Sequence, residues 1–511
     1  MSLSLLQEHS NAVSKVNSTS IKLLFTCLLL LSTLHAEESI EIDLSGFDIE
    51  EQDNDESDLN GFGEDLDGFG ESESIELNEL AKVEEKTTPY TLLGNIAFKT
   101  NYGYTDHKVK AYKADSVGIE YAGFNQMQVS SYLQFDTKLS NTWKIRISGD
   151  AFYDFTYDIN TQNNYNQAIL DAYQTQLRFD DTYIQGSVSK DIDVKVGRQI
   201  VVWGKSDNIR ITDVINPLDN RLPGLTDIED LRLSTTMAKF DYYVGDWSFS
   251  AMAIFESRIF LEAAPRGEFF PVDVVFPGFA PDPFIQLQQP KSDLNNVQYA
   301  FAANGVFSGW DLSFYGADVL DTRWHLEGAL PNASRVVSKV QMLGSAFNIV
   351  KGSWLFKSEL AYLNGLKYNS TKNEKRRVDT LIGVDYMGVI NTVLSLEVAL
   401  RHILNYESQM SGLTAGLVPD YVEENEMQTA IRVTHSMQND TLNATLLLST
   451  FGHNWQYGGF FRASLEYDLM DALVMNFGLI DYLDTSIKED KPFIHAIRNN
   501  DKIFLDITYS F

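Results

Sequence analysis

The sequence has little of what several large classes of protein require. It contains one cysteine in 511 residues, and 40 Lys and Arg against 71 Asp and Glu, for a formal net charge of −31. Nucleic-acid binding depends on clustered basic side chains, so this balance argues against a nucleic-acid partner. Beyond residue 34 there is no run of about 18 apolar residues, which excludes a polytopic helical membrane protein.

The short apolar run near the N-terminus predicts a secretory signal peptide. Two lysines precede the apolar core Leu23–Leu31, and the small residue Ala36 ends the segment. An N-terminal anchor helix is the alternative, but the apolar stretch is too short for one. We predict that residues 1–36 are removed. Because Cys27 lies in this segment, the mature chain would have no disulfide and no cysteine-based metal site.

Residues 37–88 form an acidic leader, which we predict to be disordered and periplasmic. Of residues 37–86, 20 are acidic and two are basic, so the leader repels itself and buries little apolar surface. Asp-Leu-x-Gly-Phe occurs three times within it, ending at Phe47, Phe62 and Phe69. These phenylalanines are candidates for binding a periplasmic or inner-membrane partner. A low-complexity spacer is the alternative.

From about residue 89 the hydrophobic pattern has a period of two, which predicts β-strands. Odd positions in 143–155 are mostly apolar and even positions mostly polar, and 394–401 and 456–469 alternate in the same way. The alternating runs are longer than the five or six residues typical of a soluble sandwich, and they suit tilted strands that cross a bilayer. Their polar faces would line a wet interior.

We predict eighteen strands, at residues 91–104, 126–138, 142–158, 172–188, 192–203, 231–244, 247–258, 296–307, 310–320, 337–350, 353–363, 376–388, 392–404, 426–437, 440–451, 456–469, 472–483 and 500–511. Tight turns such as Gly245-Asp246 alternate with long polar loops, which is the layout of an outer-membrane barrel. Sixteen strands are the alternative, because 192–203 and 310–320 alternate poorly. Residues 89–511 are therefore predicted to form an all-β, transmembrane antiparallel β-barrel.

The last strand carries a predicted assembly signal. Its apolar residues share one face and end at Tyr509 and Phe511. A terminal aromatic residue on an alternating strand resembles the recognition strand that outer-membrane proteins present to the barrel-assembly machinery. We therefore expect the cell outer membrane as the location, with its lipid and lipopolysaccharide as surroundings.

The densest polar motif contains Gly197-Arg198-Gln199, Trp203-Gly204 and Asn216-Pro217-Leu218-Asp219. It closely resembles the bacterial outer-membrane barrel family catalogued as domain of unknown function 1302, which shows a Gly-Arg-Gln strand, a Trp-Gly turn and an Asn-Pro-Leu-Asp loop. Members of that family resemble porins and are often associated with RND-type exporters. The resemblance implies transport without naming the solute, and the acidic leader lies outside it.

The same motif leads into the third long loop, where charges of both signs are mixed. If this loop folds into the lumen, opposed charges would orient a dipolar or charged solute. The candidates for a pore constriction are Arg198, Lys205, Asp207, Arg210, Asp213, Asp219 and Arg221. An inert plug held by its own salt bridges is the alternative. The candidates for the lumen wall are Lys144, Arg146, Glu397, Arg401, Arg432 and Arg462.

The fourth long loop, 259–295, is rich in proline and phenylalanine. Such a loop, if exposed to water, would tend to associate with other apolar surfaces. We expect it to pack into the barrel mouth or against lipopolysaccharide, with a path for an apolar ligand as the alternative.

Together these patterns predict an outer-membrane channel for passive or partner-assisted passage of a small solute, a hydrophobic solute included. The alternative is an accessory subunit of an RND-type exporter that docks through the acidic leader. The sequence has no Gly-rich phosphate loop and no HExxH or CxxC motif, and no serine is placed as a nucleophile beside the barrel histidines. We therefore predict no catalytic residue, metal or cofactor, and a protein that is not an enzyme.

Overall fold

The computed structural model describes residues 90–109, 118–160, 165–270, 287–328, 334–411, 420–484 and 493–511. The predicted signal peptide and the acidic leader, with Phe47, Phe62 and Phe69, lie outside these residues. Most of the Pro- and Phe-rich part of the fourth long loop lies outside them as well.

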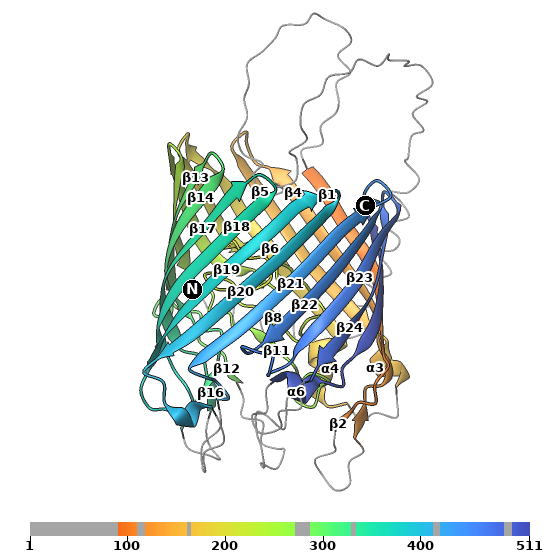
Figure 1. Ribbon diagram of the computed structural model, residues 1–511. Coiled ribbons are helices and arrows are strands. Elements are labelled where there is room, and N and C mark those ends of the chain that lie inside the picture. The colour runs from red at the N-terminus through yellow and green to blue at the C-terminus, as the bar shows by residue number, and fades with distance from the viewer. Residues whose placement is uncertain are drawn as a thin grey trace, which may run out of the picture. The chain divides into compact units, whose positions relative to one another are not determined.

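Eighteen antiparallel strands form one closed barrel (Figure 1). They are β1 (Tyr90–Gly103), β4 (Gly123–Lys138), β5 (Trp143–Asp154), β6 (Thr175–Ser189), β7 (Ile192–Gln199), β9 (Thr235–Val244), β10 (Trp247–Ile254), β13 (Gln298–Phe307), β14 (Trp310–Leu320), β17 (Lys339–Lys351), β18 (Trp354–Leu366), β19 (Lys375–Val389), β20 (Thr392–Leu404), β21 (Asn425–Met437), β22 (Leu442–Phe451), β23 (Gly459–Met470), β24 (Leu473–Leu483) and β25 (Lys502–Ser510). The prediction of eighteen strands is confirmed, and the alternative of sixteen is wrong.

The first and last strands close the barrel. Asn95–Gly103 of β1 pair with Lys502–Ser510 of β25. The backbones of Gly94 and Phe511 then exchange two hydrogen bonds of 2.9 Å. A Cβ atom on Gly94 would lie 2.8 Å from the Phe511 ring, so glycine leaves the space that this ring fills.

The two ends of the barrel differ in their connections. At the end where β1 begins, the turns are short, and Gly245, Gly309, Gly352 and Asn391 have the positive φ that tight hairpin turns need. At the other end the connections are long and carry short elements. These are β2 (Lys108–Val109), β3 (Ile119–Glu120), α3 (Thr156–Ile159), α4 (Gln167–Tyr173), β8 (Asp219–Asn220), β11 (Leu261–Glu262), β12 (Leu287–Gln288), β15 (His325–Glu327), β16 (Ser334–Val336), the 3₁₀ turn η1 (Ser408–Met410) and α6 (Phe493–Ile497). In the part of the chain that the structure describes, no helix is long and apolar enough to span a membrane.

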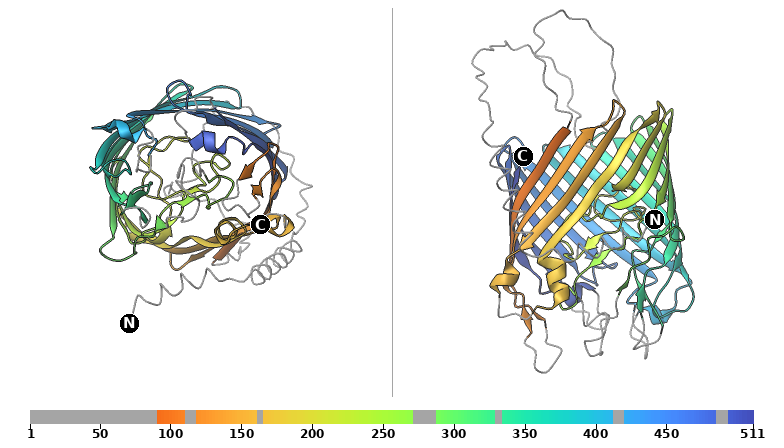
Figure 2. Two further views of the ribbon diagram at one scale, coloured as in Figure 1. Left: turned by 90° about the horizontal axis from the view of Figure 1, so that it is seen from below. Right: turned by 180° about the vertical axis from the view of Figure 1, so that it is seen from behind.

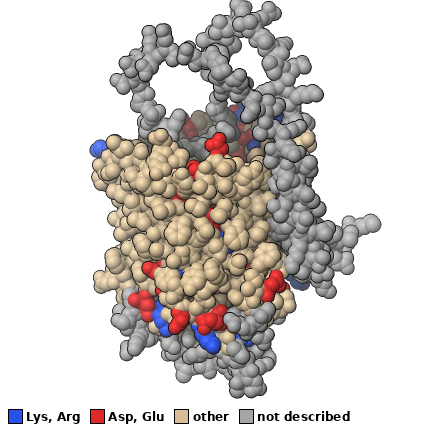
Figure 3. Space-filling view, turned by 90° about the vertical axis from the view of Figure 1, so that its right-hand side faces the viewer, with Lys and Arg blue, Asp and Glu red and all other residues tan. Residues whose placement is uncertain are grey.

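The outward face of the barrel is apolar. Ile382 on β19 is 73% exposed, and Leu343 and Phe240 are also exposed on other strands. Aromatic rings gather beside the short turns, as in the stacked pair Phe307 and Trp310, whose centroids are 4.2 Å apart. On the face in Figure 3, charged side chains gather mainly toward the long-loop end. An apolar belt with an aromatic girdle is the lipid-facing surface of a transmembrane β-barrel.

The inward face is less uniformly polar than the alternation predicts. Met237 on β9 and Met342 on β17 point inward and are buried against the loop that follows β7. On β14 the inward residues Tyr315 and Val319 belong to the same apolar cluster. This packing explains the poor alternation of 310–320, because the loop, and not water, covers this part of the wall.

Candidate functional site

Residues 200–234, between β7 and β9, fold into the lumen, and we call them the inserted loop. Viewed along the barrel axis, yellow-green chain crosses the inside of the ring of strands (Figure 2, left). Its first residues Val201 and Trp203 are buried in the apolar cluster with the inner wall. The Trp203 ring stacks on Tyr315 of β14, with 4.7 Å between centroids. The strand predicted over 192–203 therefore ends at Gln199, where the chain leaves the wall.

A single buried carboxylate on the wall anchors the start of the inserted loop. Oε1 of Glu359 on β18 accepts hydrogen bonds from the backbone N–H groups of Lys205 at 2.6 Å and Ser206 at 2.8 Å. Its Oε2 accepts from the N–H of Thr212 at 3.1 Å and from its hydroxyl at 2.7 Å. A Cβ atom on Gly204 would lie 2.6 Å from Oε1, and the φ of +92° also favours glycine. The Trp-Gly motif is thus a docking turn for this carboxylate.

A second carboxylate, Glu397 on β20, holds the next residues. It accepts hydrogen bonds from the Ser206 hydroxyl at 2.8 Å and from the backbone N–H groups of Asp207 at 2.9 Å and Asn208 at 3.0 Å. Glu397 is fully buried, and backbone donors offset the cost of burying its charge. Lys357 completes the cluster, with Nζ 3.9 Å from Glu397, and it also forms an ion pair with Asp207.

Asn216 ties the two ends of the inserted loop together. Its Oδ1 accepts a hydrogen bond of 2.8 Å from the Val201 N–H. Its Nδ2 donates to the backbone oxygens of Gln199 at 3.2 Å and Leu233 at 2.9 Å. The Asn-Pro-Leu-Asp motif is therefore a clamp at the base of the loop.

The charged candidates on the inserted loop all form ion pairs. The N–O distances are 3.4 Å for Lys205–Asp311, 3.1 Å for Arg210–Asp213, 2.8 Å for Arg232–Asp213 and 2.5 Å for Arg221–Asp219, and Asp207 pairs with Lys357. From the wall, Arg432 reaches Asp227 of the loop at 3.2 Å, and Arg462 pairs with the same carboxylate. The loop is thus fastened to the wall at both of its sides.

Three predicted candidates lie away from the inserted loop. Lys144 and Arg146 are on β5 near a short turn, and Arg146 pairs with Asp136 at 2.8 Å. The prediction that Arg198 belongs to the constriction is wrong. Arg198 lies on β7 opposite Thr236, two residues from Val196 and on the same outward face as Phe240. It faces away from the lumen because side chains alternate along β7, which puts Arg198 on the same face as the exposed Val196.

The inserted loop lines two cavities of similar size. The first, of about 620 Å³, lies among the long-loop ends of β18 to β22, and we call it the arginine cavity. The second, of about 640 Å³, is lined by β1, β4, β5, β6 and β25, and we call it the acidic cavity. Residues of the loop such as Arg210 and Val214 face the first, whereas Arg221 and Asp230 face the second.

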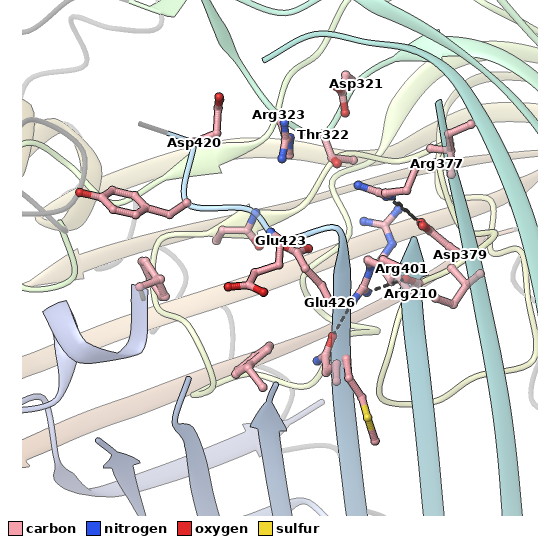
Figure 4. Close-up of a pocket in the computed structure, with 18 of the residues that line it drawn as sticks. Arg210, Asp321, Thr322, Arg323, Arg377, Asp379, Arg401, Asp420, Glu423 and Glu426 are labelled. Carbon is pink, nitrogen blue, oxygen red and sulfur yellow. Dashed lines mark hydrogen bonds and ion pairs between the residues drawn. The ribbon is translucent and has the colours of Figure 1, made fainter. Parts of the chain in front are cut away.

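Opposite charges face one another in the arginine cavity (Figure 4). Arg210, Arg377 and Arg401 lie together, and Glu423 and Glu426 lie beside them, with Glu426 of β21 opposite Arg401 of β20 in the strand register. The arginines differ in their hydrogen-bond partners. Arg377 donates two hydrogen bonds to Asp379, of 2.6 and 2.7 Å. Arg401 donates only to neutral oxygens, of Gln428 at 3.2 Å and of the Arg210 backbone at 3.4 Å, and no described carboxylate lies within 4.0 Å of it.

Much of the remaining surface of the arginine cavity is apolar. The apolar residues that line it include Ile211, Val214, Leu218, Leu320, Val340, Leu363, Met427, Phe451, Phe493 and Ile494. In small-molecule sites of this kind, the apolar lining contacts the apolar part of a solute, and a few charged groups fix the orientation of its polar group.

The acidic cavity is lined by more carboxylates than basic side chains. Arg178 lies 2.8 Å from Asp150 and 2.9 Å from Asp180, and Lys502 lies 2.7 Å from Glu268. Among the described residues, five carboxylates that line this cavity have no ion pair within 4.0 Å: Asp154, Asp181, Glu229, Asp230 and Asp506. Burial, followed by the charge of Asp227, raises the pKa of Asp230 above its ordinary value. The groups left without a partner are therefore mostly anionic.

The fourth long loop also enters the barrel mouth. Phe260 and Phe269 are buried, and the Phe269 ring lies 5.9 Å from that of Tyr482 on β24. For these residues the expected packing into the mouth is confirmed. Phe276, Phe279 and Phe284 lie outside the described residues.

Sequence reasoning missed the anchors on the wall. Lys357 and Glu359 occupy successive inward positions on β18, between the apolar Leu355 and Ala361. Charged residues on an inward face that is otherwise apolar are the signal that could have revealed them. Within the described ranges, no group of three or more His, Cys, Asp or Glu side chains is arranged to hold a metal ion.

Several solved structures are similar to this chain. They include Acinetobacter baumannii OccAB4, with 10% identity, a TM-score of 0.46 and coverage of 83% of this chain and 99% of that chain. Pseudomonas aeruginosa OpdL has 9% identity, a TM-score of 0.44 and coverage of 83% and 98%. Salmonella typhi OmpF, in a complex with daunomycin, has 9% identity, a TM-score of 0.40 and coverage of 83% and 97%. No curated protein matches the chain.

A family match covers the barrel and the inserted loop. It extends over residues 100–511 and includes the Gly-Arg-Gln, Trp-Gly and Asn-Pro-Leu-Asp motifs, so the resemblance based on these motifs is confirmed. The chain belongs to the family described as Protein of unknown function (DUF1302).

Proposed function

We propose that the protein is an outer-membrane channel for a small solute that combines an anionic group with an apolar body. Arg401 carries this proposal, because it faces a cavity of about 620 Å³ and has no carboxylate partner among the described residues. A guanidinium group held in place without an anion favours a carboxylate that can accept two hydrogen bonds. Leu363 and Phe451 on the same cavity surface would contact the apolar body.

The order of the two cavities supports a path through the barrel. The arginine cavity lies among the long-loop ends of the strands, which face the cell exterior in an outer-membrane barrel. The acidic cavity reaches from Tyr121 and Tyr157 at the long-loop end to Asn95 and Ser148 in the middle of their strands. A solute entering through the arginine cavity would meet Arg401 before it passes the inserted loop. The loop acts as the constriction in this scheme, rather than as an inert plug.

The test measures binding of an amphipathic anion inside the purified full-length channel. In planar bilayers, octanoate should block the ionic current of the wild type in a concentration-dependent way. Arg401→Gln should raise the octanoate concentration for half-block about tenfold, the effect of losing a hydrogen bond to a charged group. The matched control is Lys144→Gln, which removes one positive charge from the lumen far from the cavity. Equal block of wild type and Arg401→Gln would contradict the proposal.

Docking of an RND-type exporter through the acidic leader remains a separate prediction. Three weak contacts in one chain would raise the local concentration of one another. Replacing Phe47, Phe62 and Phe69 by Ala keeps the charge and length of the leader. If the leader docks a partner, transport in cells should fall, while single-channel conductance stays unchanged. Wild-type transport by this triple variant would show that the leader is only a tether.

A further inference from the structure

The ladder of hydrogen-bonded strands is interrupted between β6 and β7. Strand β6 has fifteen residues and β7 has eight. Thr182–Ser189 of β6 pair with β7, but Thr175–Asp181 pair only with β5 among the described residues. At the long-loop half of β6, one edge therefore has no strand of the described part of the chain beside it (Figure 2, right).

Two features of the chain produce this break. A β-bulge places Asp180 and Asp181 of β6 opposite the single residue Ser148 of β5, and a bulge commonly ends pairing or redirects side chains. The strands next to the break are also short. Strand β7 ends at Gln199, where the inserted loop begins, and β10 ends at Ile254.

The break lies between the acidic cavity and the lipid-facing surface. On the outside, Phe179 is 60% exposed and Leu177 is 41% exposed. On the inside, Asp180 and Asp181 line the acidic cavity together with Ile200. The same short stretch of β6 thus presents apolar side chains to lipid and carboxylates to the lumen.

Side chains, and not a ladder, hold the two sides of the break together. Arg198 of β7 donates a hydrogen bond of 3.0 Å to the backbone oxygen of Phe179 on the unpaired edge. The same guanidinium lies 2.6 Å from Glu256, which follows β10. An open strand edge is not tolerated against hydrocarbon unless it is covered or lines a polar cavity. Rotation of the Arg198 side chain would remove its contact with this edge, whereas a ladder would require several backbone hydrogen bonds to break.

We propose that the break between β6 and β7 is a lateral opening through which the apolar body of a solute passes between the acidic cavity and the outer leaflet of the membrane, with Arg198 as its latch. The proposal rests on the proposed function, because it requires that solute enters the lumen. It adds a second exit, which suits an amphipathic anion such as decanoate and not a small hydrophilic anion such as acetate.

The first experiment closes the opening with a bulky group. The mature chain is expected to have no cysteine, so Leu177→Cys can be labelled selectively with pyrene maleimide. Uptake of radiolabelled decanoate by whole cells should then fall about tenfold, while acetate flux and single-channel conductance stay at wild-type values. The control is Ile382→Cys, which is 73% exposed on β19 and lies in an unbroken ladder between Ser358 and Val398.

The outcomes separate the two proposals. Undiminished decanoate uptake after labelling of Leu177→Cys would overturn the lateral opening and leave the channel intact. Failure of both acetate and decanoate to enter through the unlabelled protein would instead overturn the proposed function. Equal loss of decanoate uptake in the labelled Ile382→Cys control would also overturn the opening, because the effect would then not be local.

The second experiment tests the latch without adding a label. Arg198→Gln should increase decanoate uptake severalfold and leave acetate flux unchanged, provided that heat-modifiable migration confirms a folded barrel. In a second variant, Phe179→Cys, a water-soluble thiosulfonate should react faster when Arg198→Gln is also present. An unchanged reaction rate in the double variant, with the barrel folded, would show that Arg198 does not close the break.

Discussion

The two cavities beside the inserted loop are alike in volume and differ in how their arginine side chains are paired. In the acidic cavity Arg178 is surrounded by Asp150 and Asp180, and carboxylates such as Asp181 are left over. In the arginine cavity Arg377 pairs with Asp379, whereas Arg401 has no carboxylate within 4.0 Å among the described residues. The carboxylates of Glu423 and Glu426 on the same cavity also have no ion pair among the described residues. Both cavities contain residues of both signs, so composition alone would not distinguish them. The pairing of side chains decides which charge a solute meets.

The largest change, in single-channel conductance, should follow from a substitution that joins the two cavities. Glu359→Ala removes four hydrogen bonds that hold the start of the inserted loop. The loop should then leave the wall, and single-channel conductance in planar bilayers should rise severalfold. Glu466→Ala serves as the control, because Glu466 lies on β23 near a short turn. Wild-type conductance in a folded Glu359→Ala variant would mean that other contacts suffice to keep the cavities apart.

A smaller effect should follow from changing the charge of each cavity separately. Arg210→Gln acts on the arginine cavity and Arg221→Gln on the acidic cavity. Each should shift the reversal potential toward cation selectivity, because one positive charge at the loop is lost. Asp213→Asn and Asp219→Asn should shift it in the opposite direction.

The control for these charge changes is Lys190→Gln, which removes the same charge at an exposed short turn. If all four loop variants keep the reversal potential of the wild type, the inserted loop is an inert plug, as the alternative interpretation of the sequence holds.

The smallest change in ion selectivity should come from pH. It should arise in the acidic cavity and not in the arginine cavity. The pKa of Asp230 is raised by burial and then by Asp227, and that of Glu229 by burial and then by Asp230. Because a raised pKa means protonation at a higher pH, the acidic cavity should lose negative charge before an ordinary carboxylate would. Cation selectivity should therefore decline as the pH falls from neutral into the mildly acidic range.

Asp230→Asn removes one of these two groups and should flatten that decline, measured as reversal potential against pH. A decline of the same size in wild type and Asp230→Asn would assign the titration to other carboxylates of the lumen.

Most of the barrel could be predicted from local sequence pattern. Alternation and turn residues predicted eighteen strands, and most predicted ends lie within a few residues of those observed. The larger errors occur where side chains redirect the chain. The strand predicted over 142–158 ends at Asp154, whose carboxylate accepts hydrogen bonds from the N–H groups of Met127 at 3.0 Å and Thr156 at 2.9 Å.

The candidate site was predictable only in part. The sequence by itself determined that 197–221 is a special segment, since its Trp-Gly and Asn-Pro motifs have no role in an alternating strand. It also determined which residues carry charge. Only the tertiary structure decided that Glu359 and Glu397 dock this segment and that Arg198 faces outward. It also decided that Arg401 has no carboxylate partner among the described residues. Alternation is a local property of neighbouring residues. Pairing joins residues more than a hundred positions apart, such as Lys205 and Glu359, and depends on the register of the closed barrel and the path of the loop within it.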